Sequence, residues 1–156
     1  MTPTTPTHAD YIRRCLELAR QGAQAGNSPF GSVIVRDGQV IGESHNQVQT
    51  LLDIAAHGEI SALRVASQAL GTVDLSGATL YTSAEPCYMC SYAIRASRIS
   101  RVVIGARSPN SGGTTSVYPI LLDPQVIPWA PPPEVIQGVL LEESEALLSE
   151  FGFGHI

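Results

Sequence analysis

The chain has 156 residues, of which 44% are hydrophobic and 15% charged, and this balance is typical of one globular domain with a buried core. Nine basic residues, all of them arginine, and fourteen acidic residues give a net charge of −5, so nucleic acid is not an expected partner. No apolar run is long enough to cross a membrane, and three cysteines without a secretory leader favour the cytoplasm.

The predicted elements alternate between helices and strands along the chain. Residues 1–8, with two prolines, are predicted to be a flexible lead-in, and residues 9–156 a single domain. Apolar residues recur at helical spacing over 9–25, and Asp37-Gly38 joins two strand-like runs within 30–44 as a hairpin. The elements expected next are a helix over 58–70, a strand over 77–83, a helix over 87–97 and a strand over 100–106.

The end of the chain adds a long connection and one more strand and helix. Residues 108–133 are rich in glycine and proline and are predicted to be a variable insertion, with a strand over 134–140 and a helix over 142–151. Strands that alternate with helices predict helices on both faces of one sheet. We therefore expect a three-layer α/β/α fold whose five-stranded sheet is mixed, because it starts with a hairpin.

The first chemical motif is the spacing of Cys87 and Cys90, which leaves two residues between them. Such a pair can chelate a metal, form a redox couple or pack in a core. The pair also follows a predicted strand and opens a predicted helix, as in thioredoxin-like redox motifs. The motif alone therefore leaves all three alternatives open.

The histidine at position 57 favours the metal. His57 lies at the start of one predicted helix and Cys87 at the start of the next, 30 residues later. Two helices packed side by side on one face of a sheet can bring an imidazole and two thiolates together. Three protein ligands leave one tetrahedral position open, as in catalytic zinc sites. We interpret Glu59 as the proton shuttle of such a site, in preference to a first-turn glutamate that only stabilises its helix.

His57-x-Glu59 followed by Pro86-Cys87-x-x-Cys90 matches the signature of zinc-dependent deaminases. The chain resembles the cytidine deaminase-like superfamily from about residue 11 to residue 151, including the segments PFGSVIVRDGQVIGESHN, ATLYTSAEPCYMC and SRISRVVIGARS. The resemblance implies one catalytic Zn²⁺ per chain, held by the histidine and the two cysteines. It also implies hydrolytic deamination with release of ammonia, with Glu59 moving the protons, and a homodimer.

The same resemblance implies a set of substrate contacts. Asn46 would bind the substrate ring or sugar, Phe30 would line the pocket, and the N–H of Gly58 would donate to the base. Backbone carbonyls at Ser83 and Ala84 would receive the leaving amino group. Each has an alternative, since Asn46 can also satisfy a turn and Phe30 can also belong to the core.

The substrate is predicted from the branch features of the motif. Gly58 in place of alanine and Ser108 in place of aspartate depart from tRNA adenosine deaminases, as does the acidic charge. His-Gly-Glu is similar to fungal-type cytosine deaminases, and SPFGSVIV and TSAEPCYMC are similar to bacterial guanine deaminases. We therefore expect a free nucleobase or related small aminated heterocycle, of guanine or cytosine type, as the partner.

Three alternatives remain beside that prediction: a tRNA or other nucleic-acid adenosine deaminase, a nucleoside deaminase, and a non-enzymatic zinc or redox module. Residues 108–133 are expected to carry the substrate discrimination, because they follow a strand end near the expected pocket. Trp129 or Phe153 would close the pocket as a lid, or pack at a surface; Phe151 is left without an assigned role.

Overall fold

The computed structural model of the chain describes residues 4–154, so part of the predicted lead-in (1–3) and the last two residues of the predicted domain (155–156) lie outside it. The strands form one sheet in the order β2-β1-β3-β4-β5. Their bounds are β1 (Gly31–Arg36), β2 (Gln39–His45), β3 (Thr79–Ala84), β4 (Arg101–Ala106) and β5 (Glu134–Ile136). The sheet is mixed as predicted, because β1 pairs antiparallel with β2 and β3, whereas β3, β4 and β5 run parallel.

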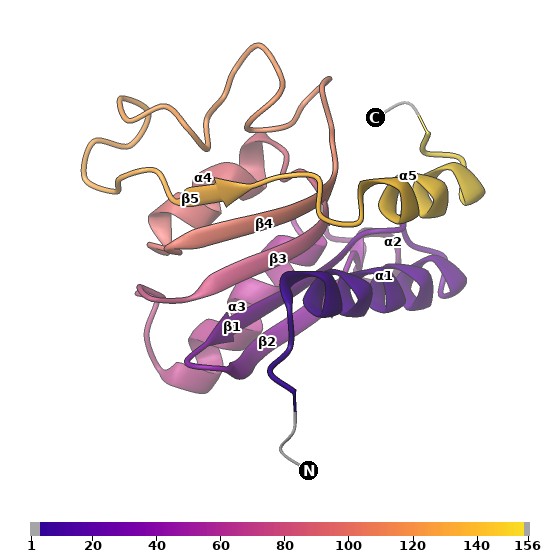
Figure 1. Cartoon of the computed structure of the whole chain (residues 1–156), viewed down its shortest axis with the longest axis horizontal. Coiled ribbons are helices and arrows are strands. Elements are labelled where there is room, and N and C mark those ends of the chain that lie inside the picture. The colour runs from indigo at the N-terminus through magenta and orange to yellow at the C-terminus, as the bar shows by residue number, and fades with distance from the viewer. Residues whose placement is uncertain (1–3, 155–156) are drawn as a thin grey trace.

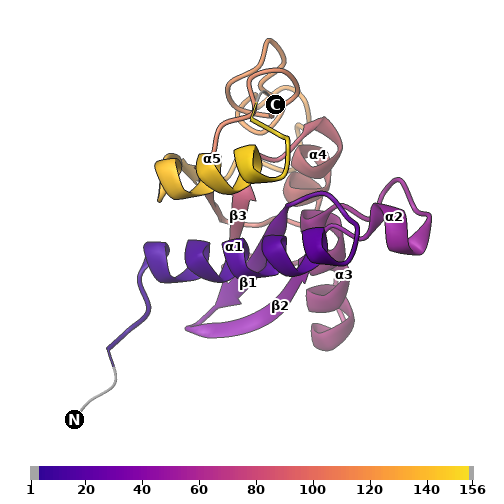
Figure 2. The ribbon, with the colours of Figure 1, turned by 90° about the vertical axis from the view of Figure 1, so that its right-hand side faces the viewer.

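Helices cover both faces of this sheet, which confirms the predicted three layers (Figures 1 and 2). The helices are α1 (His8–Gln24), α2 (Val48–Leu51), α3 (Gly58–Leu70), α4 (Tyr88–Ala96) and α5 (Leu141–Glu150). Alternation along β1 explains the layers, because Val33 belongs to the core cluster on the α1 side and Ile34 to the cluster with α3 and α4. The core therefore has two halves, one on each side of the sheet.

The predicted hairpin is confirmed by its turn. Asp37 and Gly38 both have positive φ, 52° and 73°, which is the backbone that a two-residue type I′ turn requires. The first helix begins at His8, one residue earlier than predicted. Thr7 caps it, accepting a hydrogen bond from the N–H of Asp10 while the Asp10 carboxylate accepts one from Thr7.

Two parts of the chain differ from the sequence-based expectation. The short helix α2 was not predicted, because its four residues show no helical periodicity. The last strand is limited to three residues, and residues 107–133 contain no helix and no strand of the sheet. Within the described residues, no helix is both long and apolar enough to cross a bilayer.

Candidate active site

Three potential metal ligands meet where α3 and α4 begin. His57 is the N-cap of α3, Cys87 is the N-cap of α4, and Cys90 lies in the first turn of α4. The Nδ1 atom of His57 lies 3.5 Å from each Sγ, and the three atoms lie within 4.8 Å of one another. With Zn–N and Zn–S bonds of about 2.0 and 2.3 Å, tetrahedral geometry places an N and an S ligand about 3.5 Å apart. The residues present therefore fit a zinc ion.

Electrostatics at the cysteine pair favour a metal-binding thiolate. Hydrogen bonds from Cys90 and, to a smaller extent, from His57 lower the pKa of Cys87 to about 4. The same hydrogen bond, in which Cys90 keeps its proton, raises the pKa of Cys90. The N-terminal end of α4 carries partial positive charge, which also favours an anionic sulfur there.

Glu59 lies beside these ligands and is buried, with 6% of its surface exposed. Burial raises the pKa of this carboxyl group above its usual value. The Thr82 hydroxyl lies 2.9 Å from Oε1 of Glu59 and 2.8 Å from the carbonyl oxygen of Ala84, so it can donate to either. A buried carboxyl group with one oriented oxygen suits a proton shuttle.

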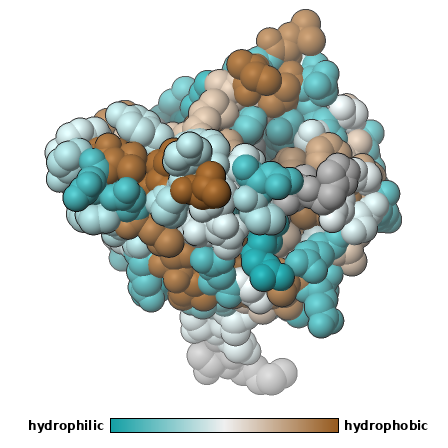
Figure 3. Space-filling model, turned by 90° about the horizontal axis from the view of Figure 1, so that it is seen from above, coloured by the Kyte–Doolittle hydropathy of each residue, from teal (hydrophilic) through white to brown (hydrophobic). Residues whose placement is uncertain are grey.

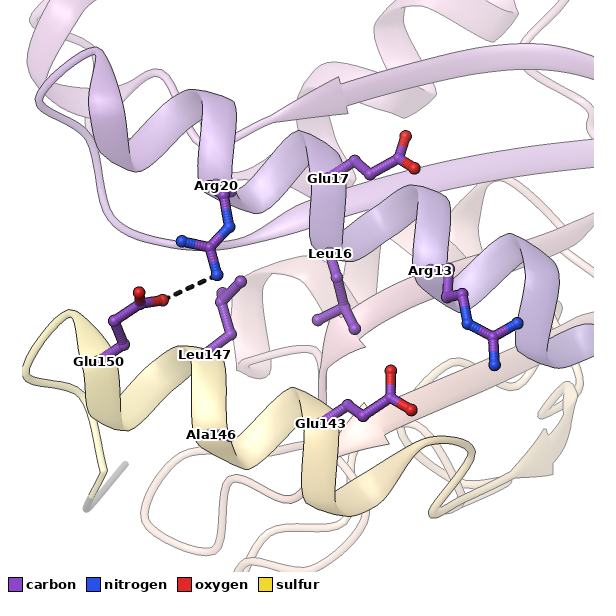
Figure 4. Close-up of a pocket in the computed structure, with 8 residues that line it drawn as sticks. All are labelled: Arg13, Leu16, Glu17, Arg20, Glu143, Ala146, Leu147 and Glu150. Atoms are coloured by element: carbon purple, nitrogen blue, oxygen red, sulfur yellow. Dashed lines mark ion pairs between the residues drawn. The ribbon is translucent and has the colours of Figure 1, made fainter.

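A cavity of about 330 Å³ opens next to these groups, within the range of small-ligand sites. It is lined by Ser28, Phe30, Asn46, Val48, Ile54, His57, Glu59, Glu85, Cys87, Ser108, Ser111 and Phe153. A larger groove of about 570 Å³ lies between α1 and α5 (Figure 4), but no group of metal ligands faces it. The chemistry of the lining residues therefore identifies the smaller cavity as the site.

Two predicted substrate contacts line this cavity. Asn46 is buried and accepts a hydrogen bond from the N–H of Val48 at Oδ1, so it satisfies a turn and also faces the pocket. Because its Oδ1 is engaged, the amide N–H₂ is the group that it can offer to a ligand. Phe30 lines the cavity and packs edge-on against Phe153, with ring centroids 5.7 Å apart.

The other predicted contacts, Ser83, Ala84 and Gly58, are not among the residues that line the cavity. Ser83 and Ala84 are buried in β3, where the Ser83 hydroxyl accepts a hydrogen bond from the N–H of Gly31. A Cβ at Gly58 would lie 3.3 Å from the carbonyl oxygen of Phe30, so the glycine allows α3 to approach the backbone at the start of β1. The roles of Ser83, Ala84 and Gly58 in binding remain predictions.

The C-terminal helix brings Phe153 to the pocket. Leu147 of α5 faces Leu16 of α1, and Glu150 pairs with Arg20 at 2.8 Å (Figure 4). The Arg20 guanidinium also lies over the ring of Phe151, 5.7 Å from its centroid. Trp129, the other predicted lid residue, is 54% exposed, does not line the cavity and lies beneath Arg98.

Sequence reasoning missed the glutamate that precedes the cysteine motif. Glu85 lines the cavity, is 4% exposed, and binds several donors between residues 108 and 115. The signal was present in the sequence, because an acidic residue placed directly between a buried strand and a metal ligand requires local hydrogen-bond donors.

Comparisons with known proteins agree with this chemistry. Residues 5–106 match the family described as the cytidine and deoxycytidylate deaminase zinc-binding region, and His57, Cys87 and Cys90 are a group in this region that could hold the zinc ion. A tRNA-specific adenosine deaminase from Aquifex aeolicus is 38% identical over 144 residues, covering 90% of this chain and 91% of that protein. A guanine deaminase from Bacillus subtilis is 44% identical over 100 residues, or 64% of each chain.

A solved structure is also similar over most of the chain. It comes from studies of A-to-I editing by tRNA:A34 deaminases at the wobble position of transfer RNA. It is 37% identical to this chain, with a TM-score of 0.83, and the match covers 88% of this chain and 98% of the other.

These comparisons contradict two predictions. A free nucleobase was expected as the substrate, and nucleic acid was not expected as a partner; the long matches to tRNA enzymes overturn both. Net charge is a poor guide to the partner because it averages over the whole surface. The homodimer and the cytoplasmic location remain predictions.

Proposed function

Since the chain belongs to the family of zinc-binding cytidine and deoxycytidylate deaminases, we propose that it hydrolytically deaminates an adenosine in transfer RNA. The observation that carries the proposal is the match to a tRNA-specific adenosine deaminase over nine-tenths of both chains. By the same reasoning, the target is the adenosine at the wobble position, as in the solved tRNA:A34 deaminase.

The cavity suits a single base taken out of its stack. Enzymes that modify a base bind it in a pocket where its edge can be read and its faces are covered. Phe30 and Phe153 offer apolar edges to a flat ring, and the Asn46 amide offers a donor to a ring or sugar acceptor. A cavity of about 330 Å³ leaves the flanking nucleotides outside, on the surface.

The buried carboxyl group of Glu59 manages the protons of the reaction. Zinc, when bound, supplies Lewis acidity that lowers the pKa of water to about 7. Glu59 holds a proton in transit between the attacking water and the departing amine, and Thr82 orients its Oε1. Because Glu59 is buried beside the cavity, its carboxyl group can pass that proton to a substrate bound there.

An acidic chain can bind RNA if few phosphate contacts are needed. Five of the nine arginines pair with carboxylates in the described residues, and a sixth, Arg95, is buried. Arg98 lies over Trp129, and Arg36 and Arg107 make no ion pair with a described residue. If phosphate contacts come from these three cations alone, the logarithm of RNA affinity should fall with the logarithm of salt at a slope of about −2 to −3.

Inosine formation in an anticodon stem-loop tests the proposal. We expect the zinc-loaded protein to convert adenosine at position 34 and to leave a matched stem-loop with guanosine at that position unchanged. Glu59→Gln serves as the inactive control. Release of ammonia from free guanine or cytosine, with no inosine in any stem-loop, would show that the proposed substrate is wrong.

A further inference from the structure

The segment 108–115 forms one wall of the cavity without belonging to any helix or strand of the sheet. Ser108 and Ser111 of this segment line the cavity, on the side opposite to α2. Residues in such a segment hold a fixed position only where specific contacts over-determine them. The contacts that fix this wall converge on one buried side chain, Glu85.

Glu85 accepts four hydrogen bonds from the segment. Its Oε1 lies 3.2 Å from the N–H nitrogen of Ser108 and 2.6 Å from the Thr115 hydroxyl. Its Oε2 lies 3.1 Å from the N–H nitrogen of Thr114 and 2.9 Å from that of Thr115. A carboxylate has about four lone-pair sites, so no acceptor of Glu85 is left for a substrate or a second metal.

Two glycines bring the segment against the metal-binding backbone. Gly112 forms an isolated antiparallel bridge with Cys87, and the N–H of Gly113 donates to the carbonyl of Pro86 at 2.8 Å. A Cβ at Gly112 would overlap the Glu85 carboxylate, and one at Gly113 would overlap the Ser91 hydroxyl. Only glycine permits this approach, at Gly112 beside Glu85 and at Gly113 beside Ser91.

We propose that Glu85 is a positioning residue that sets the place of the Ser108–Ser111 wall and thereby the affinity for the substrate. It acts through the segment and takes no part in proton transfer or metal binding. The proposal rests on the proposed function only for the choice of substrate, since the contacts of Glu85 are independent of it.

Two variants break the same contact from opposite sides. Glu85→Gln replaces one acceptor oxygen by a donor that faces other donors, and Gly112→Ala inserts a methyl group into the carboxylate. We expect each to raise KM for the stem-loop about tenfold and to change kcat less than threefold, with one zinc ion retained. The double variant should lose less than the sum of the two, because both remove one interaction.

Milder and matched variants guard against a simple loss of folding. Thr115→Val removes one of the four donors and should raise KM by a smaller factor at an unchanged melting temperature. Glu142→Gln, at an exposed glutamate of α5, is the control and should change nothing. An unchanged KM in Glu85→Gln would overturn the proposal. So would a fold-loss of kcat that exceeds the fold-rise in KM, or the loss of the zinc ion.

Hydrogen exchange separates this proposal from the proposed function. In Glu85→Gln the amides of Ser108, Thr114 and Thr115 should exchange faster, whereas those of α3 and α4 should not. If the wild-type protein edits no stem-loop, the proposed function fails, and this pattern of exchange still decides whether Glu85 fixes the wall. Exchange that is unchanged in the segment, or faster throughout the chain, counts against it.

Discussion

The two walls of the cavity are built on different principles. The zinc wall comes from the regular elements α3, β3 and α4, whose hydrogen bonds and core contacts place His57, Glu59 and the cysteines. A second wall includes Ser108 and Ser111 of residues 107–133, which lack helix and strand and instead contact two buried charged side chains, Glu85 and Arg95. Regular structure thus positions the metal ligands, and buried charges position the irregular part of the cavity wall.

Arg95 binds residues 120–130 of the segment, whereas Glu85 binds residues 108–115. It is fully buried in α4, and burial lowers the pKa of its guanidinium from the usual value. Its two terminal nitrogens donate to the backbone carbonyls of Ile120, Asp123, Ile127 and Ala130. Figure 3 shows the molecule of Figure 1 from above, with exposed hydrophobic side chains in separate groups. The exposed hydrophobic side chains of residues 107–133 include Val117 and Leu122.

The largest expected effect comes from the zinc wall. Glu59→Gln removes the proton shuttle but keeps the shape of the side chain, so kcat should fall by about 10² to 10⁴. The zinc content should stay at one ion, and the melting temperature should not fall. Inosine formation, metal analysis and thermal unfolding measure the three quantities; residual activity within tenfold of wild type would show that Glu59 is not the shuttle.

The next effect concerns the stability of the other wall. Arg95→Met leaves four buried carbonyls without their donor, and we expect the free energy of unfolding to fall by about 3 kcal/mol. Arg95→Lys, with fewer and less planar donors, should lose an intermediate amount. Denaturant unfolding measures both; a loss below about 1 kcal/mol for Arg95→Met would mean that the segment is held by other contacts.

A smaller effect is expected at Thr82, which orients the carboxyl group of Glu59. Thr82→Val keeps the shape of the side chain but removes the hydroxyl 2.9 Å from Glu59, so kcat should fall about tenfold at nearly constant KM. Thr82→Ser keeps the hydroxyl and should recover most of kcat. Equal loss in both variants would attribute the effect to packing.

The smallest effect is expected away from both walls, at the pair between Arg14 and Glu43. Hydrogen bonds from Arg14 hold the pKa of Glu43 below its usual 4.5. The resulting stability is present above pH 4.5 and disappears as the pH falls through the lower pKa of the folded state. Glu43→Gln should therefore cost less than about 1 kcal/mol at pH 7 and progressively less as the pH falls below 4.5, with kcat unchanged. A loss that does not shrink as the pH falls would point to packing instead.

The sequence predicted the zinc wall because four of its residues form a recognisable chemical motif. His57, Glu59, Cys87 and Cys90 have the residue types and the spacing of zinc-dependent deaminases, although His57 lies 30 residues before Cys87. Periodicity placed the helices that carry them. Asp37-Gly38 likewise indicated a turn, which the structure forms with two positive φ values.

The other wall could not be predicted because its contacts follow no motif that a single sequence reveals. Glu85 binds residues 23 to 30 positions later, and no periodicity connects them. The predicted substrate class was wrong because a net charge of −5 does not show how the charges are arranged; among the described residues, five of the nine arginines pair with carboxylates. Ser83 and Ala84 were named from resemblance, and their role in binding stays a prediction; the Ser83 hydroxyl accepts from Gly31, and the carbonyl of Ala84 lies 2.8 Å from the Thr82 hydroxyl.

The hydrogen bonds that join Arg95 and Glu85 to residues 107–133 have a consequence for how this enzyme can diverge. Arg95 binds only backbone oxygens of the segment, and three of the four donors to Glu85 are backbone amides. Every residue type offers the same carbonyl, and every type except proline the same N–H, so most substitutions along residues 107–133 leave these hydrogen bonds intact. The exceptions are the positions that require glycine and Thr115, whose hydroxyl also binds Glu85. Mutation can therefore change the side chains of this wall while the helices and strands that hold the metal ligands keep their positions. By this route, relatives with a common zinc site can acquire different substrates.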